Sequence, residues 1–125
     1  MNLRLRLLCA ALALPGAGPT HAAGDAAAGQ ALYQARCAAC HALDFNGVGP
    51  AHRGVFGRRA GQAPGFVYSD ALKSARVVWD EGSLDRWLAD PEQVAPGQRM
   101  GVNVPDAHER SDLIAYLKQA SAAAK

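Results

Sequence analysis

The residues best suited to chemistry are two cysteines and a histidine in the run Cys37-Ala38-Ala39-Cys40-His41. On a helix, side chains three positions apart lie on the same face, one turn from each other. The histidine that follows directly can point toward the same object. This spacing suits thioether bonds from Cys37 and Cys40 to the two vinyl groups of a haem, with the His41 imidazole as an axial ligand of the iron.

Three other chemistries also use a pair of cysteines. A redox-active cysteine pair belongs in a βαβ setting, and the sequence shows no alternating pattern that predicts a strand. A zinc site needs four ligands, and beyond the motif only His52 and His108 remain, without the spacing of a zinc-binding pair. A disulfide that closes so small a loop stabilises a fold little. Haem attachment is therefore the favoured interpretation.

An iron bound by His41 has a sixth position, for which the sequence offers Met100, His52 and His108. Met100 is the only methionine apart from Met1, and it lies in the segment PGQRMGVNVP. Glycine and proline exclude a regular helix there, so the side chain is not part of a helical core stripe. A methionine in a helix more often fills space in the core. These features favour Met100 as the distal ligand.

Two longer helices are predicted at the ends of the chain. Residues 25–40 form an alanine-rich segment with Asp25 as a suitable N-cap. Gly29 costs such a helix about 1 kcal/mol relative to alanine, which makes sense where another helix crosses closely. Residues 106–121 are predicted to form the longest helix. Its apolar face consists of Leu113, Ile114, Tyr116 and Leu117.

The segment between these helices is predicted to be mostly loop, because glycine and proline recur in it. A short helix is expected over residues 70–75, with Ser69 as its N-cap. A second is expected from the N-cap Ser83 to Pro91. The remaining long segments, 41–63 and 92–105, read as loops. The fold class predicted from these elements is all-α.

The first 22 residues have the layout of a secretory signal peptide. Arg4 and Arg6 precede the eight-residue apolar run LLCAALAL, and the small-residue site Thr20-His21-Ala22 follows. The apolar run is too short to span a bilayer, which takes about 20 residues. We therefore expect removal of residues 1–22, a mature domain of residues 23–125, no transmembrane anchor and export to the periplasm.

Removal of the signal peptide changes the charge of the protein. The full chain contains 13 Lys and Arg and 11 Asp and Glu, for a net charge of +2. Without Arg4 and Arg6 the two groups balance. A neutral chain does not indicate nucleic-acid binding, which would require a basic face.

The sequence is poor in material for a core. Hydrophobic residues make up 50% of the chain, but 27 of the 125 residues are alanine. Beyond the predicted signal peptide only 25 large apolar residues remain. A small domain buries too little surface to be stable on so few side chains. A bulky apolar cofactor in the core is therefore expected.

From Gly24 to about Ala120 the chain resembles the class I cytochromes c, of the mitochondrial and bacterial c2-like type. The matched stretches occur in the family's order and are GDAAAGQALYQARCAACH, VGPAHRGVFGRRAGQAPGFVYSDALKS, WDEGSLDRWLADPEQVAPGQRM and ERSDLIAYLK. The resemblance implies N- and C-terminal helices that cross, with short helices and long loops wrapped around one covalent haem c. It also implies that Gly29 and Tyr33 face Leu113 and Tyr116 at this crossing.

The resemblance also implies a set of haem-binding residues. The haem would be attached through Cys37 and Cys40, with His41 as proximal and Met100 as distal ligand of the iron. The carbonyl group of Pro50 would accept a hydrogen bond from the proximal histidine, which fixes its ring. The haem propionates would be bound by Arg58, Tyr68 and Trp79.

Some residues depart from the mitochondrial pattern. Trp87 stands where those members have a tyrosine near the methionine sulfur, and His52 replaces a usually apolar residue on the proximal side. Only Lys73, Lys118 and Lys125 remain of the lysine ring that mitochondrial members use for docking. The partners of mitochondrial members should therefore not be assumed for this chain.

The expected function is that of a soluble periplasmic one-electron carrier, not an enzyme. It would act as a monomer and dock transiently with membrane oxidase or reductase complexes or with periplasmic dehydrogenases. An alternative is a dedicated electron-transfer subunit of a periplasmic dehydrogenase or sulfur-oxidising complex. A third interpretation, a ligand-binding or peroxidase-like haem protein, requires that Met100 be labile.

Overall fold

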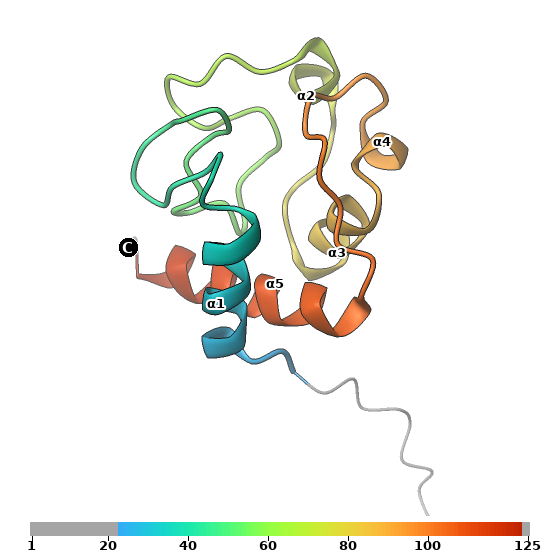
Figure 1. Cartoon of the computed structure of the whole chain (residues 1–125). Coiled ribbons are helices and arrows are strands. Elements are labelled where there is room, and N and C mark those ends of the chain that lie inside the picture. The colour runs from blue at the N-terminus through green and yellow to red at the C-terminus, as the bar shows by residue number, and fades with distance from the viewer. Residues whose placement is uncertain (1–22, 124–125) are drawn as a thin grey trace, which may run out of the picture.

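The computed structural model describes residues 23–123, so the predicted signal peptide lies outside the described residues. The described part of the chain contains helices and loops and forms no named strand, in agreement with the expected all-α class (Figure 1). Arg59 and Val78 form a single antiparallel β-bridge. The helices are α1 (Ala26–Arg36), α2 (Asp70–Ser74), α3 (Glu81–Ala89), α4 (Pro91–Val94) and α5 (Ala107–Ala122).

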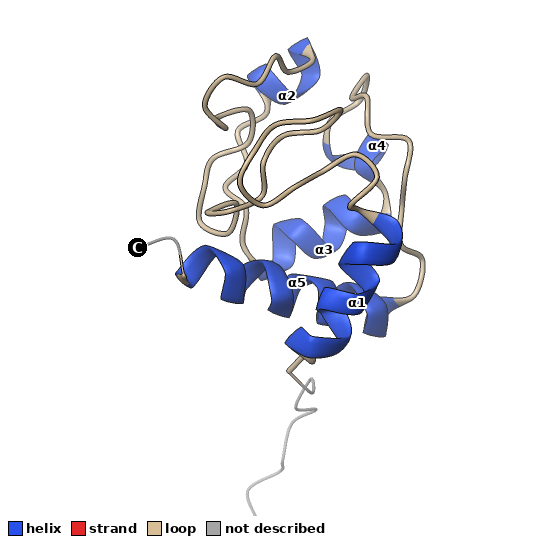
Figure 2. Cartoon of the chain, turned by 60° about the vertical axis from the view of Figure 1, so that its left-hand side comes forward, coloured by secondary structure: helices blue, strands red, loops and turns tan. Residues whose placement is uncertain are grey.

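The two terminal helices cross closely, as Figures 1 and 2 both show. Gly29 lies at the crossing, where a Cβ atom on this residue would overlap with the carbonyl oxygen of Asp112 in α5. Tyr33, Leu113 and Tyr116 are buried beside it. The glycine that weakens α1 in isolation is therefore what lets the two helix backbones approach.

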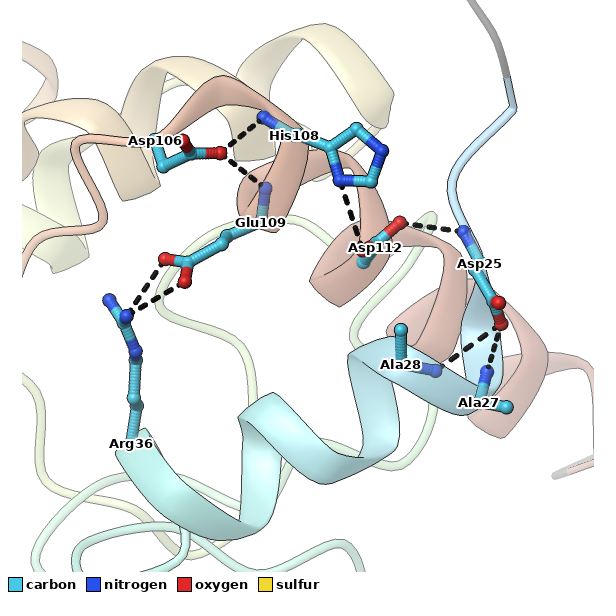
Figure 3. Close-up of polar contacts among 8 residues, drawn as sticks. All are labelled: Asp25, Ala27, Ala28, Arg36, Asp106, His108, Glu109 and Asp112. Carbon is cyan, nitrogen blue, oxygen red and sulfur yellow. Dashed lines mark hydrogen bonds and ion pairs between the residues drawn. The ribbon is translucent and has the colours of Figure 1, made fainter.

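Polar contacts hold the crossing at both ends of α1 (Figure 3). The buried carboxylate of Asp112 accepts a hydrogen bond of 2.7 Å from the backbone N–H of Asp25, and it lies 3.3 Å from Nδ1 of His108. At the other end, Arg36 pairs with Glu109 at 2.8 Å. These contacts join residues from opposite ends of the sequence.

The cap of the first helix agrees with the sequence analysis. The side chain of Asp25 accepts hydrogen bonds from the N–H groups of Ala27 and Ala28 at the start of α1. Asp106 serves α5 in the same way. The predicted extent of the first helix was too long, because α1 ends at Arg36 and residues 37–40 form a tight turn. The turn still brings the backbone N–H of His41 within 2.9 Å of the Cys37 carbonyl oxygen.

Two predictions about the short helices are wrong. Ser83 is not the N-cap of α3, because Asp80 caps this helix and Ser83 is its third residue. The two side chains satisfy each other's backbone N–H groups, so either residue looks like a cap in the sequence. The loop predicted over 92–105 begins instead as α4, which is capped by Asp90 and starts at Pro91. A proline at the first position of a helix loses no hydrogen bond.

None of the helices in residues 23–123 is long and apolar enough to cross a bilayer.

The close approach at Gly29 makes a testable prediction. Gly29→Ala should lower the free energy of unfolding by about 1–3 kcal/mol, because the added methyl group forces the helices apart. Gly82, near the start of α3, is the matched control, since a Cβ there meets only side-chain atoms at 3.6 Å. Gly82→Ala should raise stability by about 0.5–1 kcal/mol. Thermal unfolding of both holo-proteins checks this, and a stabilised Gly29→Ala variant would contradict the tight crossing.

Candidate functional site

A cavity of about 570 Å³ lies between the terminal helices, α3 and the long loops. Its lining is mostly apolar and includes the buried residues Leu72, Leu84, Leu88 and Leu113. All eight residues that the sequence analysis assigned to cofactor binding line this one cavity: Cys37, Cys40, His41, Pro50, Arg58, Tyr68, Trp79 and Met100. Residues up to 63 positions apart in the sequence thus meet at one site.

The His41 ring is held in a defined orientation. Its Nδ1 lies 2.8 Å from the carbonyl oxygen of Pro50. A carbonyl group can only accept, so Nδ1 carries the hydrogen and Nε2 keeps a free lone pair. Burial lowers the pKa of His41, and the bond to Pro50 opposes this shift only in part. The imidazole is therefore prepared to act as a neutral metal ligand through Nε2.

Gly49 makes room for this ring. A Cβ atom on Gly49 would overlap with the imidazole of His41. Pro50 follows directly, so this dipeptide supplies both the space beside the ring and the carbonyl group that orients it. The sequence analysis assigned a role only to Pro50, because the contact between Gly49 and His41 is made by the folding of the loop.

The two other histidines considered as distal ligands are not opposite His41, although His52 lines the same cavity. The His52 ring stacks on His41, with 3.9 Å between ring centroids and 18° between ring planes. Burial, together with nearby His41 and Arg58, lowers the pKa of His52 to about 3 and keeps this ring neutral. His108 is exposed on α5 beside Asp112 and does not line the cavity. Neither histidine is placed to face His41 across the cavity.

Met100 lies in the loop that follows α4 and reaches the cavity as a half-buried side chain. The backbone N–H of Met100 donates a hydrogen bond to the side-chain oxygen of Gln98. Gln98 in turn donates to Glu92 at 3.4 Å. Side chains thus brace this loop where regular secondary structure is absent. Trp87, from α3, lines the same cavity and packs against Trp79 with ring centroids 5.3 Å apart.

Cys37 and Cys40 are free thiols that line the cavity. Cys37 is half-buried, and burial raises the pKa of its thiol to about 11, whereas Cys40 is exposed. They form no disulfide. Within residues 23–123 no three or more His, Cys, Asp and Glu side chains gather as a metal cluster. The geometry thus gives no support to the disulfide or zinc alternatives.

Arg58 and Tyr68 also line the cavity and offer hydrogen-bond donors. The buried Nε of Arg58 has no hydrogen-bond partner, although its Nη2 donates to the Ala51 carbonyl at 3.0 Å. The Tyr68 hydroxyl accepts a bond of 3.1 Å from the N–H of Ala63, which leaves its own hydrogen free to donate. A buried unpaired donor is costly, so these groups indicate an acidic ligand.

The residues therefore fit a haem. The cavity offers an apolar enclosure, two thiols, an oriented imidazole, a thioether and unpaired donors for carboxylates.

The sequence analysis missed Asn46, whose side chain donates to the carbonyl oxygen of Pro64 and accepts from the backbone N–H of Ala51, both at 2.9 Å. Asn46 joins the loops that line the cavity. No local sequence signal shows which distant backbone groups an asparagine will bind.

Comparison with known proteins points to the same cofactor. The family model of cytochrome c matches residues 26–121. Cytochrome c of Chlamydomonas reinhardtii is 45% identical over 106 residues, which cover 80% of this chain and 93% of the relative. Cytochrome c2 of Rhodomicrobium vannielii is 37% identical over 117 residues, 90% and 93% of the two chains. The solved structure of cytochrome cH from Methylobacterium extorquens has a TM-score of 0.74 and 46% identity, and the match covers 77% of this chain and 99% of that one.

These matches cover most of the described chain and nearly the whole length of each relative. Their identities lie far above the level at which only a fold is shared. The matched region includes the Cys37–His41 motif and the cavity. The chain belongs to the cytochrome c family and is a class I electron-transfer protein with one covalently attached haem c.

Proposed function

We propose that the chain is a periplasmic one-electron carrier whose haem c is attached through Cys37 and Cys40 and whose iron is bound by His41 and Met100. One observation carries the proposal: a single cavity gathers both thiols, the oriented imidazole and the thioether of Met100. When bound, the haem supplies an iron that alternates between the ferric and ferrous states.

The protein tunes this chemistry from both sides. The hydrogen bond from His41 Nδ1 to Pro50 raises the basicity of Nε2 and fixes the position of Nδ1. A thioether from Met100 favours the ferrous state and raises the reduction potential. The apolar lining works in the same direction, because a low dielectric disfavours the more highly charged ferric site. With His41 and Met100 both holding the iron, electron transfer would require little movement of either side chain.

The donors Arg58, Tyr68 and Trp79 bind the haem carboxylates in this proposal. The guanidinium of Arg58 is suited to a carboxylate because it offers several N–H groups in a fixed plane. Its unpaired Nε would gain a partner there. These residues position the cofactor and shield its negative charge from the apolar interior.

Absorption spectroscopy of the exported holo-protein tests the ligand set. The ferric form should show the weak sulfur-to-iron charge-transfer band at the red edge, and the haem should stay attached after denaturation. Met100→Ala should abolish the band and lower the reduction potential, because the thioether that favours ferrous iron is lost. The control is Val78→Ala, an exposed apolar residue outside the cavity lining, which should keep the band. An unchanged band and potential in Met100→Ala would exclude Met100 as ligand.

Export follows from the proposed signal peptide, residues 1–22. The matched region of cytochrome c begins at residue 26, just beyond it. N-terminal sequencing of protein recovered from the periplasm should start at Ala23 or within a residue of it. A holo-protein that begins at Met1 would show that the segment is retained.

The mode of docking distinguishes two candidate functions, a free carrier and a dedicated subunit of a larger enzyme. Both lysines in the described residues are already paired, Lys73 with Asp70 at 3.3 Å and Lys118 with Glu81 at 2.7 Å. This leaves little free lysine charge to steer docking to acidic partners. The observation favours the alternative function, that of a dedicated subunit of a larger enzyme.

Purification of the native protein separates these candidates. A free carrier should be recovered as a monomer that exchanges electrons with more than one partner complex, through small, short-lived interfaces. Because the mature chain is neutral, its rate should depend only weakly on ionic strength. Recovery with a stoichiometric partner that persists through purification would instead establish the dedicated subunit.

A further inference from the structure

His52 is connected both to His41 and to helix α1. Its Nδ1 lies 3.1 Å from the hydroxyl oxygen of Tyr33, within hydrogen-bond distance. Its ring faces the imidazole of His41 at 3.9 Å, nearly parallel to it. The backbone N–H of His52 also donates to the carbonyl of Ala42, the residue after His41, at 2.9 Å. His52 is thus bonded on one edge and stacked on one face.

Tyr33 gives this arrangement a rigid base. Its side chain is only 2% exposed. The ring packs against Tyr116 of α5, with centroids 5.3 Å apart, and meets His52 edge-on at 5.6 Å and 66°. The Tyr33 hydroxyl is therefore a fixed point set by the crossing of α1 and α5.

The bond from His41 to Pro50 does not by itself fix the plane of the ligand ring. A single hydrogen bond at Nδ1 holds one atom and leaves rotation of the ring about that contact comparatively soft. A flat group stacked on the ring face opposes this rotation. An aliphatic side chain at position 52 would fill the space without presenting a plane. The imidazole presents one, and the bond to Tyr33 prevents that plane from turning.

We propose that Tyr33 and His52 are a positioning pair for His41, through which the helix crossing sets the orientation of the proximal ligand ring. The inference rests on the proposed function in one respect, that His41 is the proximal ligand of the haem iron.

The test uses the exported holo-protein and the variants Tyr33→Phe, His52→Phe and the double variant. Tyr33→Phe removes one hydroxyl group and keeps the buried ring. His52→Phe keeps a flat ring against His41 but cannot bond to Tyr33. Tyr116→Phe is the matched control, because it removes a hydroxyl group from the neighbouring ring and leaves the contact between Tyr33 and His52 intact. The readouts are the g-values of the ferric iron and the paramagnetically shifted proton resonances of the His41 ring.

Both single variants should shift the g-values and the His41 resonances beyond their line widths, and the double variant should add no further shift to that of His52→Phe. Tyr116→Phe should leave both readouts at their wild-type values. A merely structural role of the Tyr33 hydroxyl would lower the unfolding temperature and leave the iron spectra unchanged.

The outcomes separate this inference from the proposed function. If the wild-type protein shows a His- and Met-ligated spectrum and Tyr33→Phe does not change the His41 signals, the positioning pair is refuted and the proposed function stands. Additive shifts in the double variant would refute the pair as well, because the two residues would then act independently. If the wild-type spectrum shows no histidine on the iron, both proposals fall.

Discussion

The chain must fold around a cavity of about 570 Å³ with few large apolar side chains to spare. Without a cofactor the apolar side chains that line this cavity would lack packing partners, and an unfilled space in a core costs stability. The haem therefore serves as core material as well as a redox centre, and it lets the long loops between α1 and α3 dispense with regular secondary structure.

The crossing of α1 and α5 closes the fold around that cavity. It brings the two ends of the chain together through Gly29 and the buried carboxylate of Asp112. It also places Tyr33 beside the proximal side of the site. The two sides of the cavity are built differently. Backbone geometry and a ring stack hold His41, whereas side-chain bonds from Gln98 brace the loop of Met100.

Much of the secondary structure could be predicted because helix caps are local signals. Asp25 and Ser69 act on N–H groups two or three residues away, and each was recognised from the sequence. The errors also have local causes. Asp80 and Ser83 form a reciprocal pair in which either residue resembles the cap. The single turn of α4 follows Asp90 and begins at Pro91, and the glycine and proline residues soon after it, Pro96 and Gly97, led to the prediction of a loop.

The sequence by itself determined the cofactor, because Cys37, Cys40 and His41 lie within five residues at the spacing that haem attachment requires. It also indicated the scarcity of core, since composition does not depend on the fold. Only the tertiary structure decided what surrounds the ligand ring. Gly49 meets the His41 ring, and His52 stacks on it, although both residues are separated from His41 along the chain. The burial of the unpaired Nε of Arg58 likewise depends on the path of the loops. Such contacts depend on how loops close in space, and loops without a periodic pattern carry no local signal of their path.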